Sequence, residues 1–212
     1  MPFVMHEDEL VAIAGTRDMW WPTALPTVER EDLDKLAVSA SRGLASLVER
    51  GLVRRANDVV EWHEQLSAVL DPVLRGPRLT LYETVWHRPT AAPALALHLH
   101  PAMPAEWVVE TADNGRHEFV VTHDDGVREI ITDVVAGVHA ITDEAGLTPS
   151  RRILVITQDI RPGQEAVVVY PGGVVTGTFP PEPGPLQDVK HTTEGAVNHA
   201  LRLLRSVGEG RP

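Results

Sequence analysis

The chain has 212 residues, of which 43% are hydrophobic and 23% are charged, and it contains no cysteine. This composition is typical of a globular protein with one domain or two tightly fused subdomains. The formal net charge of −11 argues against non-specific binding to nucleic acid or to an anionic membrane. Without cysteine there are no disulfides, thiolate metal sites or cysteine nucleophiles.

The first residues carry acidic side chains where a signal peptide has basic ones, and no segment approaches the roughly 18 apolar residues of a membrane span. We therefore expect a cytoplasmic protein without a membrane partner. Residues 8–15 predict a short helix, followed by a loop in which Trp20 and Trp21 pin the chain to the core. Thr27 is the expected N-cap of the next helix.

Residues 34–70 predict two helices joined by a turn at Gly51, since glycine readily ends a helix. Helical spacing places one apolar stripe on the first helix, formed by Leu33, Leu36, Ala37, Ala40, Leu44, Leu47 and Val48. Asp58 and Glu61 resemble a capping box that starts the second helix. That helix is expected to end near residues 71–72 or 75–77, because proline disfavours a helical residue before it.

Alternating and apolar runs then predict two blocks of antiparallel strands. The first block comprises residues 78–87, 94–100, 106–111 and 117–123, with an Asn114-Gly115 hairpin turn. A helix is expected over residues 127–145, strands over 152–159, 165–170 and 173–178, and a last helix over 192–207. This order predicts an α+β fold, with antiparallel meander sheets packed against an N-terminal helical pair, a middle helix and a C-terminal helix. We expect one domain, residues 1–212, with possible subdomains 1–77, 78–146 and 147–212.

A metal site is one functional hypothesis. His98 and His100 alternate on an expected strand and share a face, and His87 on the neighbouring strand is a possible third ligand. Two histidines on a solvent-facing side of the strand are the competing interpretation. This pair underlies the alternative that the protein is a metal-dependent enzyme.

Other catalytic signatures are absent from the sequence. No serine stands in a GxSxG motif, and the glycines at 172, 173 and 177 do not form a phosphate-binding loop. No carboxylate pair is assigned to acid and base roles. The sequence therefore favours a protein without catalytic residues or cofactors.

A winged-helix regulator is a second alternative, because residues 44–55 resemble the end of a recognition helix and the strand after it. The candidate recognition helix offers mainly Lys35, Arg42 and Arg50. We expect an acidic-capped helix after Arg55 rather than a β-hairpin wing, and the net charge opposes nucleic acid as a partner.

The turn Arg50-Gly51-Leu52-Val53, a short polar insertion, a helix reaching Pro72 and a strand run from Leu79 together resemble the EspG family of type VII secretion-associated proteins. The resemblance covers most of the chain in element order. It implies a cytosolic α+β chaperone without catalytic residues, which holds the helical tip of a secreted substrate, such as a PE–PPE pair, until export.

A chaperone of this kind needs an apolar groove or loop rimmed by polar groups. The candidate partner-binding segment is a loop of small residues between two expected strands, formed by Arg88, Pro89, Thr90, Ala91, Ala92 and Pro93. An ordinary hairpin loop is the alternative interpretation of the same residues.

Overall fold

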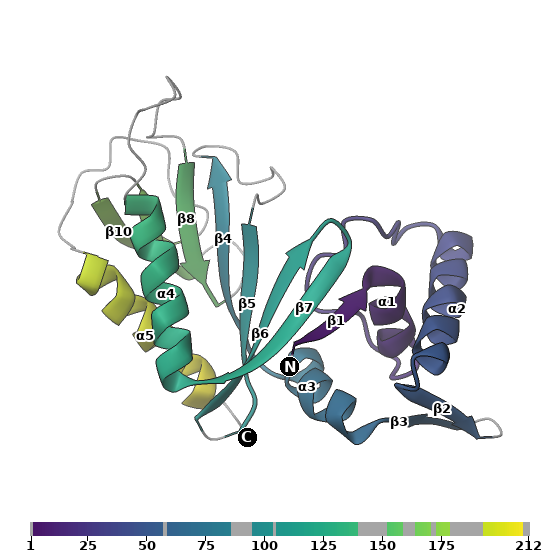
Figure 1. Cartoon of the computed structure of the whole chain (residues 1–212). Helices are drawn as coiled ribbons and strands as arrows, with labels where there is room; N and C mark the ends of the chain where they lie inside the picture. Colours follow the sequence, from purple (N-terminus) through teal and green to yellow (C-terminus); the bar gives the residue numbers. More distant parts are fainter. Residues whose placement is uncertain are drawn as a thin grey trace. The chain divides into compact units, whose positions relative to one another are not determined.

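The computed structural model describes residues 2–56, 59–85, 95–103, 105–139, 152–158, 164–170, 173–178 and 193–209 (Figure 1). The chain forms two compact units, Met1–Gly76 with Val108–Val121, and Pro77–Trp107 with Thr122–Pro212. Each unit combines helices with antiparallel strands, so the predicted α+β class is confirmed. The single domain of residues 1–212 and its subdomains stay a prediction.

In the first unit, three antiparallel strands lie in the order β1-β7-β6. Its strands are β1 (Phe3–His6), β6 (Glu106–Asp113) and β7 (Arg116–His123). Asn114 and Gly115, between β6 and β7, have φ angles of 47° and 79°. Both residues of this turn thus adopt the left-handed conformation of a type I′ hairpin, as the Asn-Gly pair predicts.

Strand β1 is followed along the chain by two helices, α1 (Glu7–Gly15) and α2 (Leu33–Glu49). Helix α2 starts later than expected: its N-cap is Asp32, whose side chain accepts a hydrogen bond from the Lys35 amide at 3.1 Å. Thr27 is not the cap, because its amide and hydroxyl are both bound to the Glu7 carboxylate. The predicted end is confirmed, since Gly51 follows the helix with a φ of 69°.

The second predicted helix begins in the wrong place. Residues 53–62 instead form the hairpin β2 (Val53–Ala56) and β3 (Val59–Trp62), and helix α3 (Glu64–Arg75) follows with His63 as N-cap. The predicted Asp58–Glu61 capping box is therefore wrong, because Val59 and Val60 are β-branched and favour a strand. Pro72 lies inside α3, so the alternative end at residues 75–77 is the correct one.

The second unit is built on an antiparallel sheet in the order β5-β4-β8-β9-β10. Its strands are β4 (Leu79–Val85), β5 (Leu95–Pro101), β8 (Arg152–Thr157), β9 (Glu165–Tyr170) and β10 (Gly173–Thr178). Helices α4 (Asp124–His139) and α5 (Thr193–Glu209) pack on each other and on this sheet. Residues 140–145, predicted to extend the middle helix, lie outside the described residues.

Residues 153–157 of β8 and 166–169 of β9 are buried without interruption, as in strands that are covered on both faces. Tyr82, Ile153, Val155, Ala166 and Val168 form one buried cluster on a single face of the sheet. Among the described residues, no helix is both long and apolar enough to cross a membrane.

Candidate functional site

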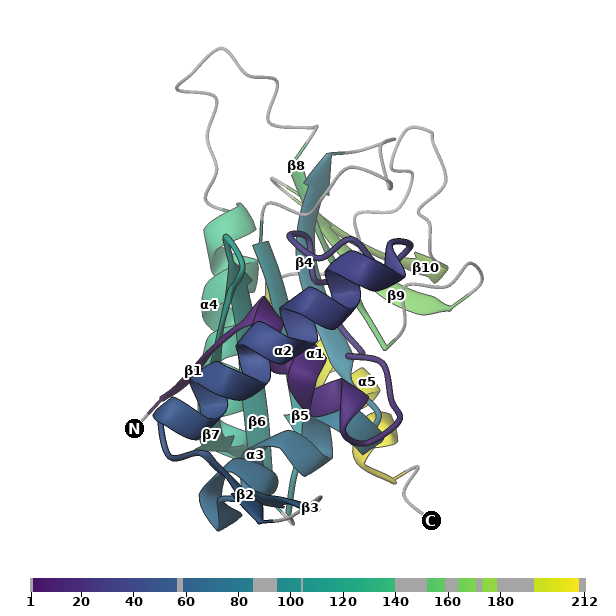
Figure 2. The ribbon, with the colours of Figure 1, turned by 90° about the vertical axis from the view of Figure 1, so that its right-hand side faces the viewer.

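Helices α1 and α2 touch at backbone distance, and Gly43 makes this possible. A Cβ atom at Gly43 would lie 1.9 Å from the carbonyl oxygen of Asp8. The fully buried residues of α2 are Ser39, Gly43 and Leu47, which follow one another at intervals of four residues. Helix α2 crosses α1 (Figure 2), and the buried face of α2 is centred on Gly43 and made largely of small residues.

This packing turns part of the predicted apolar stripe outward. Only Leu47 of the stripe is fully buried, whereas Leu33 is 76% exposed and Val48 is 44% exposed. Ala37 is also exposed, and the other members are half-buried. The apolar stripe is thus buried only in part, because α2 packs on α1 along the line of Ser39, Gly43 and Leu47.

The outward side of α2 carries small and apolar residues at the spacing of a coiled coil. Val38, Ser41, Ala45 and Val48 are all exposed and recur at intervals of three, four and three residues. Such spacing places them in one row that faces another helix in a heptad seam. We call these four residues the α2 seam. This spacing is present in the sequence, but the leucines of the neighbouring stripe give a stronger apolar signal and favour a different face of the helix.

Ion pairs fix the rotation of α2 and so keep the seam outward. The buried carboxylate of Glu9, which is 1% exposed, accepts hydrogen bonds from Arg50 Nη1 at 2.7 Å and Ser46 Oγ at 2.7 Å. At the preceding residue of α1, Arg42 Nε donates to Asp8 Oδ2 at 2.9 Å and Nη2 donates to Oδ1 at 3.3 Å. Both pairs join α1 to α2, so neither helix can rotate without breaking a charge-assisted bond.

Buried polar groups hold the loop between α1 and α2 in place. Glu110 Oε1 accepts from Thr23 Oγ1 at 2.8 Å and from Trp21 Nε1 at 3.3 Å, and it lies 2.8 Å from His117 Nδ1. Glu110 and His117 are both fully buried. The prediction that tryptophans pin this loop is confirmed for Trp21 and wrong for Trp20, which is 44% exposed.

Glu7 makes a second anchor for the same loop. Its Oε2 accepts hydrogen bonds from the amide and the hydroxyl of Thr27, and its own amide donates to the Gly115 carbonyl at 3.1 Å. The Glu7 Oε1 atom lies 3.8 Å from His117 Nε2, so both nitrogens of the buried imidazole face a carboxylate. The loop that leads into α2 is therefore tied to α1 and to strands β6 and β7.

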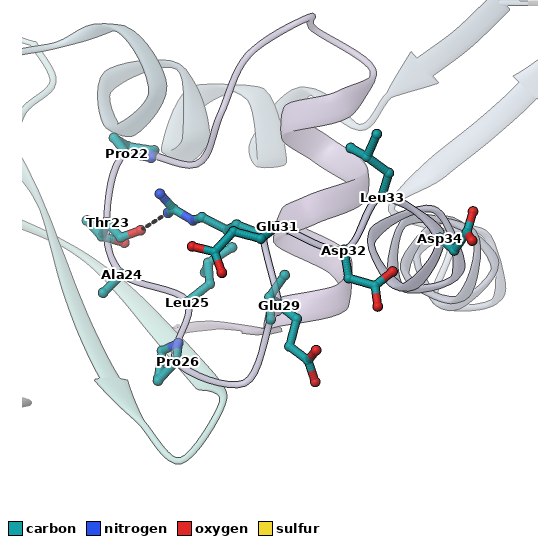
Figure 3. A pocket seen from close by; sticks show the side chains of 12 residues that line it. Pro22, Thr23, Ala24, Leu25, Pro26, Glu29, Glu31, Asp32, Leu33 and Asp34 are labelled. Carbon is teal, nitrogen blue, oxygen red and sulfur yellow. Dashed lines mark hydrogen bonds between the residues drawn. The ribbon is translucent and has the colours of Figure 1, made fainter.

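Two hollows adjoin the start of α2. The larger, with a volume of about 1040 Å³, is lined by residues 22–26 and 28–34 (Figure 3), and the smaller, of about 330 Å³, reaches Val38 and Arg42. Both are lined by Glu29 and Asp34, and the larger also by Glu31 and Asp32. We call the larger one the acidic hollow. It adjoins the N-terminal end of α2, and its carboxylates are partly balanced by Arg30, which also lines it, and by Lys35, which pairs with Glu29 and Asp32.

The site residues predicted from the sequence lie elsewhere in the chain. The candidate loop Arg88–Pro93 and His87 lie outside the described residues. His98 and His100 are described, and their rings share one side of β5 with centroids 6.3 Å apart. Both are buried, so the competing prediction of a solvent-facing pair is wrong.

His98 Nδ1 lies 3.0 Å from Thr80 Oγ1 on the neighbouring strand, which gives the ring a structural partner. Within the described part of the chain, no three His, Asp or Glu side chains gather closely enough to hold a metal ion. The histidine pair alone supplies two of the three or four protein ligands that a zinc site uses.

The β2–β3 hairpin corrects one argument about DNA binding, because a hairpin does follow the candidate recognition helix. The basic side chains of that helix are already engaged, however. Lys35 Nζ lies 2.6 Å from Glu29 Oε2, and Arg42 is paired with Asp8. The outward side of α2 therefore carries small and apolar groups next to carboxylates. A DNA-binding recognition helix carries unpaired cations in this position instead.

Comparison with known proteins assigns the chain to no family. No protein-family model matches the chain, and no curated protein matches it either.

Proposed function

We propose that this protein is a non-enzymatic chaperone or adaptor that binds a helical segment of another protein. The observation that carries the proposal is the α2 seam, a row of exposed small and apolar residues at heptad spacing on a helix whose rotation is fixed. Heptad seams in proteins are covered by a second helix, whose side chains pack into the spaces between the seam residues. A helix is accordingly the partner that this surface fits best.

The resemblance to the EspG family supports the same class of function and suggests a cytoplasmic site of action. In that case the partner is a secreted helical protein, held in the cytoplasm with its apolar helix covered. The α2 seam and the candidate loop at residues 88–93 are then two parts of the chain that compete as the binding site. The experiments below separate them.

Small residues in the seam favour close approach of the partner. Ser41 and Ala45 carry short side chains, so a second helix can lie near the backbone of α2, while Val38 and Val48 supply apolar contacts at the two ends. The smaller hollow, which is lined by Glu29 and Asp34, reaches the end of the seam at Val38. A partner helix with lysine or arginine at the corresponding end would complement this charge.

Co-purification from the native host tests the proposal. Tagged protein should retain a predominantly helical protein, and the purified pair should rebind. Val38→Glu replaces an apolar contact at one end of the seam with a carboxylate, and we expect the affinity to fall about 100-fold because the apolar contact is lost and the charge gives up water on binding. Ala136→Glu is the matched control, since Ala136 is an exposed residue of α4, and this variant should bind as the wild type does.

Two outcomes would contradict the proposal. One is a purified complex that binds the Val38→Glu variant as tightly as the wild type. The other is a chain that retains no helical protein under any extraction condition, while both variants remain folded by circular dichroism.

DNA binding is a second candidate, which the β2–β3 hairpin after α2 favours. In this case Arg54, which is exposed on β2, would meet a phosphate next to the helix. A mobility-shift assay at low salt tests it, because the electrostatic part of DNA binding is strongest there. Absence of a shift under those conditions would remove this candidate.

A further inference from the structure

We infer that the folded chain holds one extra proton between the buried side chains of Glu7 and His117, and that this proton ties the loop before α2 to α1 and β7. This goes beyond the proposed function, because it concerns the chain without a partner. Two buried polar atoms carry the inference. Among the described residues, Glu7 Oε1 and His117 Nε2 are buried side-chain atoms without a hydrogen-bond partner, and they lie 3.8 Å apart.

The hydrogen bonds around His117 show where a hydrogen is missing. Trp21 Nε1 is a donor only, so Glu110 Oε1, which it contacts at 3.3 Å, is an acceptor. His117 Nδ1 lies 2.8 Å from the same oxygen and therefore carries a hydrogen. A neutral imidazole has only one hydrogen on its two ring nitrogens, so Nε2 of a neutral ring would be a bare acceptor.

Glu7 lacks a hydrogen on its side of the contact as well. Its Oε2 accepts from the Thr27 amide at 2.8 Å, and its Oε1 is a second acceptor that faces His117 Nε2. Two buried acceptors that face each other without a hydrogen are unfavourable. One proton on Nε2 satisfies both atoms and makes the 3.8 Å contact an ion pair. The proton lies on the imidazole because histidine is the more basic of the two side chains in water.

The surroundings separate this proton from solvent. His117 and Glu110 are 0% exposed, and Glu7 is 2% exposed. Met5 lies opposite His117 in the sheet and is fully buried, and the Phe119 ring stacks on the imidazole with the ring centroids 6.4 Å apart. The charge of the imidazolium is matched by two carboxylates, which offsets the cost of burying it.

Other charged side chains on the elements packed around His117 have partners of their own or are exposed. They are Asp8 with Arg42, Glu9 with Arg50, Arg116 with Glu118, Arg30, which donates to the carbonyl oxygens of Trp21 and Thr23, and the exposed His6 and Asp113. In the described part of this unit, Glu7 and Glu110 are thus the charged groups that face the ring.

The proton makes the anchoring of the loop depend on pH. Above about pH 6.5 a histidine of the unfolded chain is neutral, whereas the folded chain keeps the proton between Glu7 and His117. The folded state then binds one proton more than the unfolded state, so stability falls as the pH rises, by up to about tenfold in the folding equilibrium constant per pH unit. Below about pH 6.5 both states are protonated and the contribution is complete.

NMR of protein with isotopically labelled histidine counts the hydrogens on the ring directly. The His117→Gln variant identifies the signals of His117 among those of the ten histidines. At about pH 7.5 only about one free imidazole in ten carries a hydrogen on both nitrogens. We expect both nitrogens of His117 to carry one at this pH.

Glu7→Gln tests the role of the carboxylate. The amide oxygen still accepts from Thr27 and the amide nitrogen donates to Nε2, so a neutral ring is satisfied without the extra proton. Urea titrations between about pH 6 and 9 should show the fall in stability for the wild type and a much flatter curve for Glu7→Gln. Glu64→Gln is the matched control and should keep the wild-type slope, because Glu64 is also the first residue of a helix but is exposed.

The Thr27 amide and the Trp21 indole report on the loop. Their NMR signals should shift over the same pH range in the wild type and in Glu64→Gln, and stay constant in Glu7→Gln. A His117 ring with a single hydrogen at about pH 7.5 overturns the inference, and this spectrum decides even where Glu7→Gln does not fold. Equal slopes for the wild type and Glu7→Gln overturn it as well. Loop signals that stay constant while His117 loses its proton overturn the link to the loop.

Discussion

Substitution of Gly43 by alanine is expected to destabilise the protein, although helix propensity alone predicts the reverse. Alanine in the interior of a helix is favoured over glycine by about 1 kcal/mol. The new methyl group, however, would lie 1.9 Å from the carbonyl oxygen, 2.3 Å from the carbonyl carbon of Asp8 and 2.7 Å from the amide nitrogen of Glu9. All three are backbone atoms, so no side chain can rotate away to make room.

Normal contact distance requires α1 and α2 to separate by about 1.5 Å at this point. Overpacking of this kind costs about 3 kcal/mol, and the separation also lengthens the Arg42–Asp8 and Arg50–Glu9 pairs. After the gain in propensity, we expect the free energy of unfolding to fall by about 2 kcal/mol. Urea denaturation followed by circular dichroism and tryptophan fluorescence measures this change.

Gly137→Ala provides the matched control. Gly137 is also inside a helix, but a Cβ atom there would have no neighbour within 4 Å. We expect this variant to gain about 0.5 to 1 kcal/mol from propensity alone. If Gly43→Ala were as stable as Gly137→Ala, the close contact between α1 and α2 would be refuted, and with it the reason that the seam faces outward.

Further predictions concern groups that are buried around this framework. Arg50→Ala leaves the buried Glu9 carboxylate without its cation, and we expect the free energy of unfolding to fall by about 2 kcal/mol. This loss is smaller than for a fully buried pair, because Arg50 is partly exposed. Arg54→Ala, measured in the same urea titration, should change stability little, and equal losses in the two variants would contradict the role of the Glu9 pair. Burial raises the pKa of Tyr82, so stability is retained below the unfolded pKa of about 10 and falls as the pH rises above it, because only the unfolded tyrosine ionises there. Tyr82→Phe should make this alkaline fall shallower in denaturation curves recorded at pH values from about 9 to 11, whereas an unchanged slope would show that Tyr82 does not contribute.

The strands of the second unit were predictable because their sequence signals are local. Alternation over residues 79–85 and the apolar runs at 152–157 and 165–170 specify strands wherever they lie in the fold. The Asn114-Gly115 turn and the end of α2 before Gly51 were predictable for the same reason, since each depends on the φ angles that its own residues allow.

Errors occurred where tertiary contacts override local pattern. Asp58 and Glu61 fit a capping box, but β-branched neighbours form the β2–β3 hairpin instead. Thr27 fits an N-cap, but the buried Glu7 carboxylate binds it. Both cases depend on residues distant in the sequence, or on the balance between two local preferences, and neither can be resolved from one segment alone.

The candidate binding surface was predictable in part. Heptad spacing at residues 38, 41, 45 and 48 is visible in the sequence, yet the leucines of α2 suggest a different inward face. What decides between the two faces is the contact of Gly43 with Asp8 and Glu9, which joins segments more than 30 residues apart. Glycine in a helix is by itself only a weak helix breaker, and its packing role becomes apparent only beside its partner.

Photo-cross-linking of a purified partner complex tests the central claim most directly. Because the chain has no cysteine, a benzophenone group can be attached at one position in each of Ser41→Cys, Ala91→Cys and Ala136→Cys. The α2 seam predicts that the partner cross-links strongly from position 41 and not from position 136, and that the cross-linked peptide of the partner is helical. A complex that forms with all three proteins but cross-links only from position 91 or 136 would contradict the seam as the binding surface.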